Sequence, residues 1–249
     1  MPRVLCARFP HLGLLATWRR HPELRAEPVV IGGAPELRLP VVAASAAAEA
    51  AGVRAGQPLR EAQQRCPAAV FVALDEAEVD QLRQAAITAL CGVAPAVEVG
   101  DDEAFADLSG SHARHPSETA WAVATARVLT AALGDAPAVG VAGSRFVART
   151  AARIGTPGHV RRVKEGEEAA FLAPLPLHLL PGDRAVLARL AALGLDCAGA
   201  VAGLALADMQ RQFGPAGLAV HRLGRTRPPR LRAVHSARRS GGPYAARRA

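Results

Sequence analysis

Short apolar runs alternate with longer amphipathic stretches over the first two-thirds of the chain. The apolar runs predict buried strands at 4–7, 29–31, 41–43, 70–73, 96–99, 139–142 and 159–163. Apolar residues at helical spacing, bounded by glycine, proline and a capping serine, predict helices over 11–20, 44–51, 59–66, 76–91, 117–133 and 145–154. From residue 165 onward only short helices are predicted. This order is typical of an α+β body followed by an all-α region.

The stretch "AVEVGDDEAFADLSG" (96–110) places three acidic residues between two short predicted strands, the second of which closes on Asp107. Asp101, Asp102 and Glu103 follow directly on the first strand. Two interpretations are open. The acids are the solvated tip of a hairpin, or they gather there because carboxylates hold divalent metals.

Length and composition indicate a cytoplasmic globular protein. The 249 residues are 50% hydrophobic, enough for a core divided between two or three subdomains. No uncharged run approaches the roughly 18 residues needed to span a bilayer, and arginines interrupt the start of the chain, so we expect neither a membrane segment nor a signal peptide. The four cysteines are scattered, which predicts neither a zinc site nor a disulfide framework.

The net charge of +8 comes from one end of the sequence. Eight arginines and no acidic residue lie between Arg225 and the last residue, which leaves 30 − 8 = 22 basic against 22 acidic residues in 1–224. The body is therefore formally neutral. The basic segment 225–249 is expected to be a disordered tail that either binds phosphates or only solubilises the protein.

Several segments, in order, resemble the Y-family (UmuC/DinB-type) translesion DNA polymerases. The resemblance rests on "HPELRAEPVVIGG" (21–33), "VVAASAAAEAAGVRAGQPLREAQQRCP" (41–67), "VEVGDDEAFADLSG" (97–110), "GVAGSRFVARTAARIGTPG" (140–158) and "FLAPLPLHLLPG" (171–182). It implies an α+β palm, a ferredoxin-like sheet with helices, together with fingers and a small all-α thumb. The implied boundaries are 1–10 and 69–163 for the palm, 11–68 for the fingers, 164–224 for the thumb and 225–249 for the tail.

The resemblance also gives the acids a position. Asp102 and Glu103 stand where the family has carboxylates of a two-metal site, which requires divalent ions about 3.5–4 Å apart. The family's third carboxylate belongs in "VLCARFPHLGLLA" (4–16), at the position of Arg8. An arginine there brings a permanent cation with five donors. We therefore expect Arg8 to pair with Asp102 or Glu103, which would leave a vestigial metal site.

The implied nucleotide site departs from the family in the same direction. The tyrosine and arginine that hold the triphosphate correspond to Ala46 and Glu49, so a negative charge would face a polyphosphate. Arg145 and Arg149 keep the cationic character of the palm helix. They are either phosphate contacts or ordinary charges on an amphipathic helix.

These departures are similar to the ImuB-type branch of the family, which implies a non-catalytic accessory in DNA repair and damage-induced mutagenesis. Its expected partners are DNA, bound weakly and electrostatically, and other mutasome or replication proteins such as an error-prone polymerase, with no membrane and no cofactor. One alternative is an active translesion polymerase that uses Mg²⁺ and recruits another carboxylate, such as Asp101. A second alternative is a truncated, inactive remnant without the little-finger domain.

Overall fold

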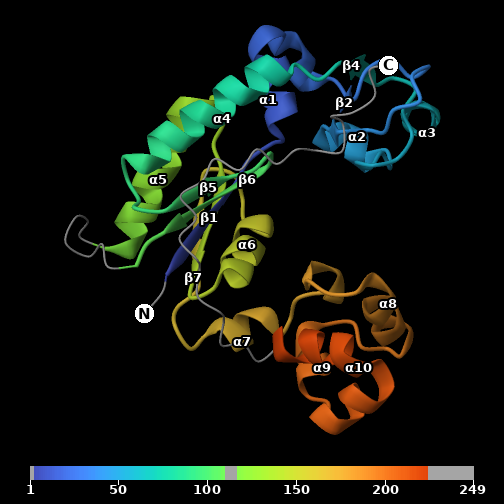
Figure 1. The fold of residues 1–249 in the computed structure, drawn as a ribbon, viewed down its shortest axis with the longest axis vertical. Helices are drawn as coiled ribbons and strands as arrows, with labels where there is room; N and C mark the ends of the chain where they lie inside the picture. The colour runs from blue at the N-terminus through green and yellow to red at the C-terminus, as the bar shows by residue number, and fades with distance from the viewer. Residues whose placement is uncertain (1–2, 110–116, 224–249) are drawn as a thin grey trace, which may run out of the picture.

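A five-stranded sheet forms the centre of the protein, in a computed structural model that describes residues 3–109 and 117–223 (Figure 1). Its strands, in spatial order, are β5 (Val97–Val99), β6 (Glu103–Asp107), β1 (Val4–Arg8), β7 (Ala138–Ala142) and β8 (Val160–Arg162). Neighbouring strands are antiparallel except for β7 and β8, which are parallel. The expected basic tail, 225–249, lies outside the described residues.

Helices cover both faces of this sheet. The long helices α4 (Glu76–Cys91) and α5 (Glu118–Leu133) lie side by side on one face, and α6 (Arg145–Arg153) lies on the other (Figure 1). Because successive strand residues point to opposite faces, Leu5 and Ala7 pack toward α4 and α5 while Cys6 packs toward α6. Gly140 permits close approach of α6, since a Cβ there would lie 2.1 Å from the carbonyl oxygen of Ala148.

The segment between β1 and α4 forms a second unit around a small sheet. Helix α1 (Leu12–Arg20) and the 3-10 helix η1 (Pro22–Ala26) lead into it. The sheet order is β3 (Ala43–Ala44), β2 (Val29–Ile31) and β4 (Val70–Val72), and helices α2 (Ala46–Ala50) and α3 (Leu59–Arg65) accompany it. Because β4 pairs with β2, residues 70–72 belong to the small sheet of this unit.

The C-terminal part of the described chain is helical. Its elements are α7 (Glu168–Leu172), the 3-10 helix η2 (Leu177–Leu179), α8 (Arg184–Ala192), α9 (Ala198–Ala202) and α10 (Leu206–Leu223). Helix α10 is broken at Gly214, whose φ of 59° lies in the left-handed region, directly before Pro215. Figure 1 shows these helices on the α6 side of the large sheet. Leu172, Leu190 and Met209 share one apolar core with α6.

The α+β architecture expected from the sequence is confirmed. Each predicted strand and helix before residue 165 is present, with bounds that differ by a few residues, and only helical elements follow β8 in the described part. Helix α5 begins after Ser117, whose hydroxyl accepts a hydrogen bond from the Ala120 amide as the predicted N-cap. Within the described ranges, every helix is too short or too polar to cross a membrane.

Candidate functional site

The acidic turn connects β5 to β6 and is tied to the end of β1. The Gly100 amide donates to the carbonyl oxygen of Glu103 at 2.8 Å, which closes the hairpin. The carbonyl oxygens of Asp102 and Asp101 accept from the amides of Phe9 at 3.0 Å and Leu12 at 2.6 Å. These bonds bring the acids beside the junction of β1 and α1. The structure therefore assembles in space the two segments that the sequence singled out.

Arg8 lies directly opposite Glu103 in the antiparallel pairing of β1 with β6. Directly opposed residues of such a pair share one face of the sheet, with Cβ atoms about 4.5–5.5 Å apart. The Arg8 side chain is nevertheless exposed and forms no ion pair with any residue that the structure describes. The expected pairing of Arg8 with Asp102 or Glu103 is wrong, because a different arginine holds Glu103.

That arginine is Arg149, which reaches Glu103 from α6. Its Nε donates to Oε2 of Glu103 at 2.7 Å, and its Nη2 bonds Oε1. One turn earlier on the helix, Arg145 makes a bidentate contact with Glu98. Its Nη1 donates to Oε2 at 2.5 Å and its Nη2 donates to Oε1 at 2.6 Å. Both guanidinium groups lie over the ring of Phe105, at 3.7 Å from its centroid for Arg145 and 5.3 Å for Arg149.

The result is a ladder of alternating charges between α6 and the β5–β6 hairpin. Hydrogen bonding to Arg145 holds the pKa of the Glu98 carboxyl below its ordinary value. The same contact raises the pKa of Arg145. Both arginines that the sequence offered as phosphate contacts therefore bind carboxylates of the protein itself. Glu98 was missed from the sequence, although its alternation with Val97 and Val99 in a short strand places it on the face opposite theirs.

The other two acids of the turn have different surroundings. Asp101 accepts from Nη2 of Arg83, on α4, at 2.7 Å. Asp102 is exposed, and its carboxylate has no ion-pair partner among the described residues. Nearby, Nδ1 of His11 accepts from the Gly13 amide at 3.0 Å and caps α1. Burial lowers the pKa of His11, against the opposite effect of the two aspartates.

The residues present do not fit a two-metal centre. Such a centre needs several carboxylates converging on the ions. Here Glu103 is engaged by Arg149, Asp101 by Arg83, and Arg8 stands opposite Glu103 as an additional cation. Within residues 3–109 and 117–223, no three histidine, cysteine or acidic side chains are grouped so that they could hold a metal. Asp102 is the one acid of the turn that forms no ion pair with a described residue.

Ala46 and Glu49 lie one helical turn apart on α2, in the unit of the small sheet. Ser45 caps this helix, and both residues are exposed. The Glu49 carboxylate forms no ion pair in the described part of the chain, although Nη1 of Arg54 donates to the Glu49 carbonyl oxygen at 2.5 Å.

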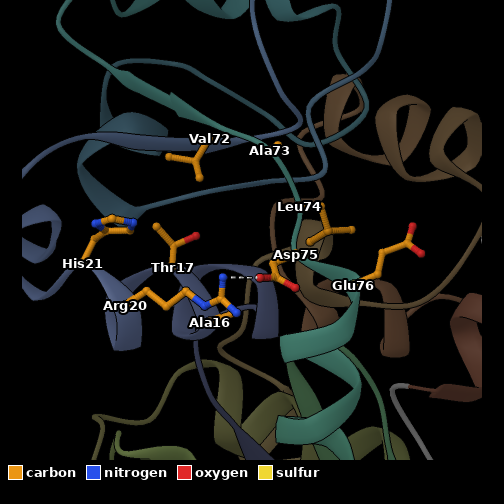
Figure 2. A pocket seen from close by; sticks show the side chains of 9 residues that line it. All are labelled: Ala16, Thr17, Arg20, His21, Val72, Ala73, Leu74, Asp75 and Glu76. Carbon is orange, nitrogen blue, oxygen red and sulfur yellow. Dashed lines mark ion pairs between the residues drawn. The ribbon is translucent and has the colours of Figure 1, made fainter.

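A shallow concavity of about 490 Å³ lies away from the acidic turn, between the C-terminal half of α1 and the β4–α4 connection (Figure 2). Arg20 and Asp75 form an ion pair at its wall, with Nη1 and Oδ2 2.9 Å apart. Thr17, His21 and Glu76 complete its polar lining. None of the candidate residues from the sequence lines it.

Comparison with known proteins identifies a family. The model of the impB/mucB/samB family matches residues 15–153. DNA polymerase IV of Dehalococcoides mccartyi (strain ATCC BAA-2266) is 36% identical over 185 residues, which are 74% of this chain and 47% of that protein. DNA polymerase IV 2 of Mesorhizobium japonicum is 35% identical over 87% of this chain and 52% of its own length. The chain thus spans about half the length of these relatives.

Solved structures share the fold. The crystal structure of DinB from Sulfolobus solfataricus superposes with a TM-score of 0.79 at 21% identity, over 90% of this chain and 67% of that one. The insertion ternary complex of Dbh DNA polymerase gives a TM-score of 0.75 at 21% identity, over 90% of this chain and 67% of that chain. This coverage is larger than the part of the chain that the family model matches.

Proposed function

The chain belongs to the impB/mucB/samB family and is a Y-family DNA polymerase-like protein, and from this premise we propose that it serves DNA repair as an accessory without polymerase activity. In this proposal the five-stranded sheet with α4, α5 and α6 is the palm, the unit of the small sheet is the fingers and residues 164–224 are the thumb. Residues 70–72 then go with the fingers, because β4 pairs there.

One observation carries the proposal: Arg8 stands opposite Glu103 while Arg149 holds the Glu103 carboxylate. A metal that binds Glu103 would have to displace the bidentate contact with Arg149. Bidentate arginine–carboxylate contacts are among the stronger ion pairs that proteins form. It would also have to settle beside the fixed positive charge of Arg8. Both effects oppose divalent binding, and nucleotidyl transfer depends on such ions.

The fingers support the same conclusion. An incoming triphosphate carries several negative charges, and the exposed Glu49 would repel it rather than bind it. The side chain of Ala46, one turn away, has no hydrogen-bond donor. In this proposal the protein therefore binds neither the divalent ions nor the nucleotide that polymerisation needs.

The partners in this proposal are DNA and other proteins of damage-induced mutagenesis, such as an error-prone polymerase. Dbh, which shares the fold, has been solved as an insertion ternary complex, and this supports DNA as a partner. In this proposal the protein is similar to the ImuB-type branch of the family.

A second candidate is an active translesion polymerase that uses Mg²⁺ with Asp101 as the replacement ligand. The unpaired carboxylate of Asp102 favours it, because one family position remains free to bind an ion. The Arg83 contact to Asp101 opposes it, since the proposed replacement ligand is already engaged.

Primer extension separates these two candidates. The full chain is assayed on a primer–template with Mg²⁺ and with Mn²⁺, beside a DNA polymerase IV relative as the positive control. We expect no added nucleotide from this protein. Extension that is lost in Asp102→Ala would overturn the proposal and establish the polymerase.

Nucleotide binding gives an independent test. A ligand that binds only the folded state raises the melting temperature, because it stabilises that state by RT ln(1 + [L]/Kd). We expect dATP at millimolar concentration to leave the melting temperature unchanged, and the double variant Arg8→Asp, Glu49→Arg to gain part of such a shift. Protection of the unmodified protein by dATP would contradict the proposed loss of nucleotide binding.

A further inference from the structure

Charges around the acidic turn are paired inside the protein, with two exceptions. Arg83 pairs with Asp101, Arg145 with Glu98 and Arg149 with Glu103. Arg8 and Asp102 are left, and neither forms an ion pair within the described part of the chain. Whatever approaches this face from solvent therefore meets one uncompensated guanidinium and one uncompensated carboxylate.

The Arg8 guanidinium differs from a flexible surface charge because its backbone is fixed. Arg8 is the last residue of β1, the middle strand of the five-stranded sheet, and it is paired on one side with Glu103 and on the other with Ala138. The next residue, Phe9, is held by the hydrogen bond that its backbone amide donates to the Asp102 carbonyl oxygen. Only the side chain is free to move, and it is exposed at the junction between the large sheet and α1.

We propose that Arg8 binds a backbone phosphate of DNA directly, so that a protein cation acts where a polymerase would use a metal ion. Arginine presents a planar fork of donors that matches two phosphate oxygens. Since Arg149 already neutralises Glu103, the residue directly opposite Arg8 does not compete for its guanidinium. This inference rests on the proposed function and gives the ligand chemistry of the same site: a phosphodiester, bound without divalent ions.

The remaining anion, Asp102, sets the strength of this contact. The eight charged groups around the acidic turn sum to zero at neutral pH: four arginines (Arg8, Arg83, Arg145 and Arg149) and four acids (Glu98, Asp101, Asp102 and Glu103). Removing the Asp102 charge leaves a net charge of +1 and should strengthen phosphate binding. In a metal site the same change would weaken binding, so the sign of the effect distinguishes the two chemistries.

The test is the salt dependence of DNA binding by the full chain in EDTA. Binding is measured by the fluorescence anisotropy of a labelled duplex with a recessed 3′ end. Each phosphate neutralised contributes about −0.9 to the slope of log K against log salt. Arg8→Ala should reduce the magnitude of the slope by about 0.9 and weaken binding about eightfold at 0.1 M salt. Arg8→Lys should keep the slope, and Asp102→Asn should raise the affinity severalfold.

Arg127→Ala is the matched control. Arg127 is exposed on α5, on the opposite face of the large sheet, and forms no ion pair among the described residues. Its removal lowers the net charge by the same amount but should leave the slope unchanged. Melting temperatures of both variants should equal that of the unmodified protein.

Three results would overturn the inference. An equal slope for Arg8→Ala and the unmodified protein, or an equal loss in Arg8→Ala and Arg127→Ala, would place the affinity elsewhere. The third is DNA binding that requires Mg²⁺ at constant ionic strength and is lost in Asp102→Asn. The proposed function is judged separately by primer extension, so a failure of Arg8 to bind phosphate would leave it standing.

Discussion

The ion pair between Arg3 and Glu118 offers a direct test of how β1 is held to α5 and to the segment that follows β8. Arg3 precedes β1, and Glu118 is the first residue of α5. Nη2 of Arg3 donates to Oε2 of Glu118 at 2.8 Å and to the carbonyl oxygen of Val163 at 2.9 Å, and Nε bonds the other carboxylate oxygen. One side chain thus joins β1, α5 and the segment that leads to α7. We predict that Glu118→Gln destabilises the protein substantially.

The magnitude follows from burial. The side chains of Arg3 and Glu118 are only 13% and 15% exposed. Removing one partner of such a pair leaves a buried charge without its counterion, which costs about 3–5 kcal/mol. Because glutamine keeps one acceptor oxygen for Arg3, we expect the lower end, about 3 kcal/mol. For a protein of this size this loss corresponds to a fall in melting temperature of roughly 6–12 °C.

Urea unfolding and thermal melting, both followed by circular dichroism, measure this loss. The matched control is Glu61→Gln, which removes the partner of Arg65 in an ion pair whose side chains are 42% and 49% exposed. An exposed pair one helical turn apart contributes about 0.5 kcal/mol or less. If Glu118→Gln costs no more than Glu61→Gln, the Arg3 contact does not hold these elements together and the reasoning from burial is refuted.

Two further changes test the contact of α6 with the sheet. Arg145 lowers the pKa of Glu98 from its ordinary value of 4.5, so their contact contributes stability above pH 4.5 that is lost as the pH falls through the lowered pKa. The melting temperature, measured at a series of decreasing pH values, should therefore fall less in Glu98→Gln than in the unmodified protein. Identical pH profiles of the two proteins would contradict this prediction. Gly140→Ala forces a Cβ against the backbone of α6 and should cost about 3 kcal/mol in urea unfolding, whereas Gly203→Ala, whose Cβ meets no atom closer than 3.5 Å, should cost far less.

The sequence predicted the elements well because their signals are local. The 16 residues of α4 carry apolar side chains at helical spacing and follow an acidic N-cap, and the helix has the predicted bounds Glu76–Cys91. The partner of a strand is a non-local property. Nothing within residues 70–72 distinguishes a strand that joins the small sheet from one that joins the large sheet, and the pairing with β2 became visible only in the structure.

The same limit applies to the site. The alignment of "VLCARFPHLGLLA" with its family placed Arg8 beside the acids, and the register of β1 with β6 agrees with that placement. Which arginine binds Glu103 depends on how α6 crosses the sheet, and this crossing depends on the close approach at Gly140. Sequence reasoning named both Arg8 and Arg149 as cations but had no means to rank their distances from one carboxylate.

Calorimetric titration with Mn²⁺ most directly tests the claim that internal ion pairs have replaced the metal centre. The full chain is titrated beside Asp102→Ala, with a DNA polymerase IV relative as the positive control. Because Arg149 engages Glu103 and Arg83 engages Asp101, we predict no saturable heat at micromolar Mn²⁺ for the unmodified chain or for Asp102→Ala. A saturable site of micromolar affinity that disappears in Asp102→Ala would contradict the claim and support the alternative of an active polymerase.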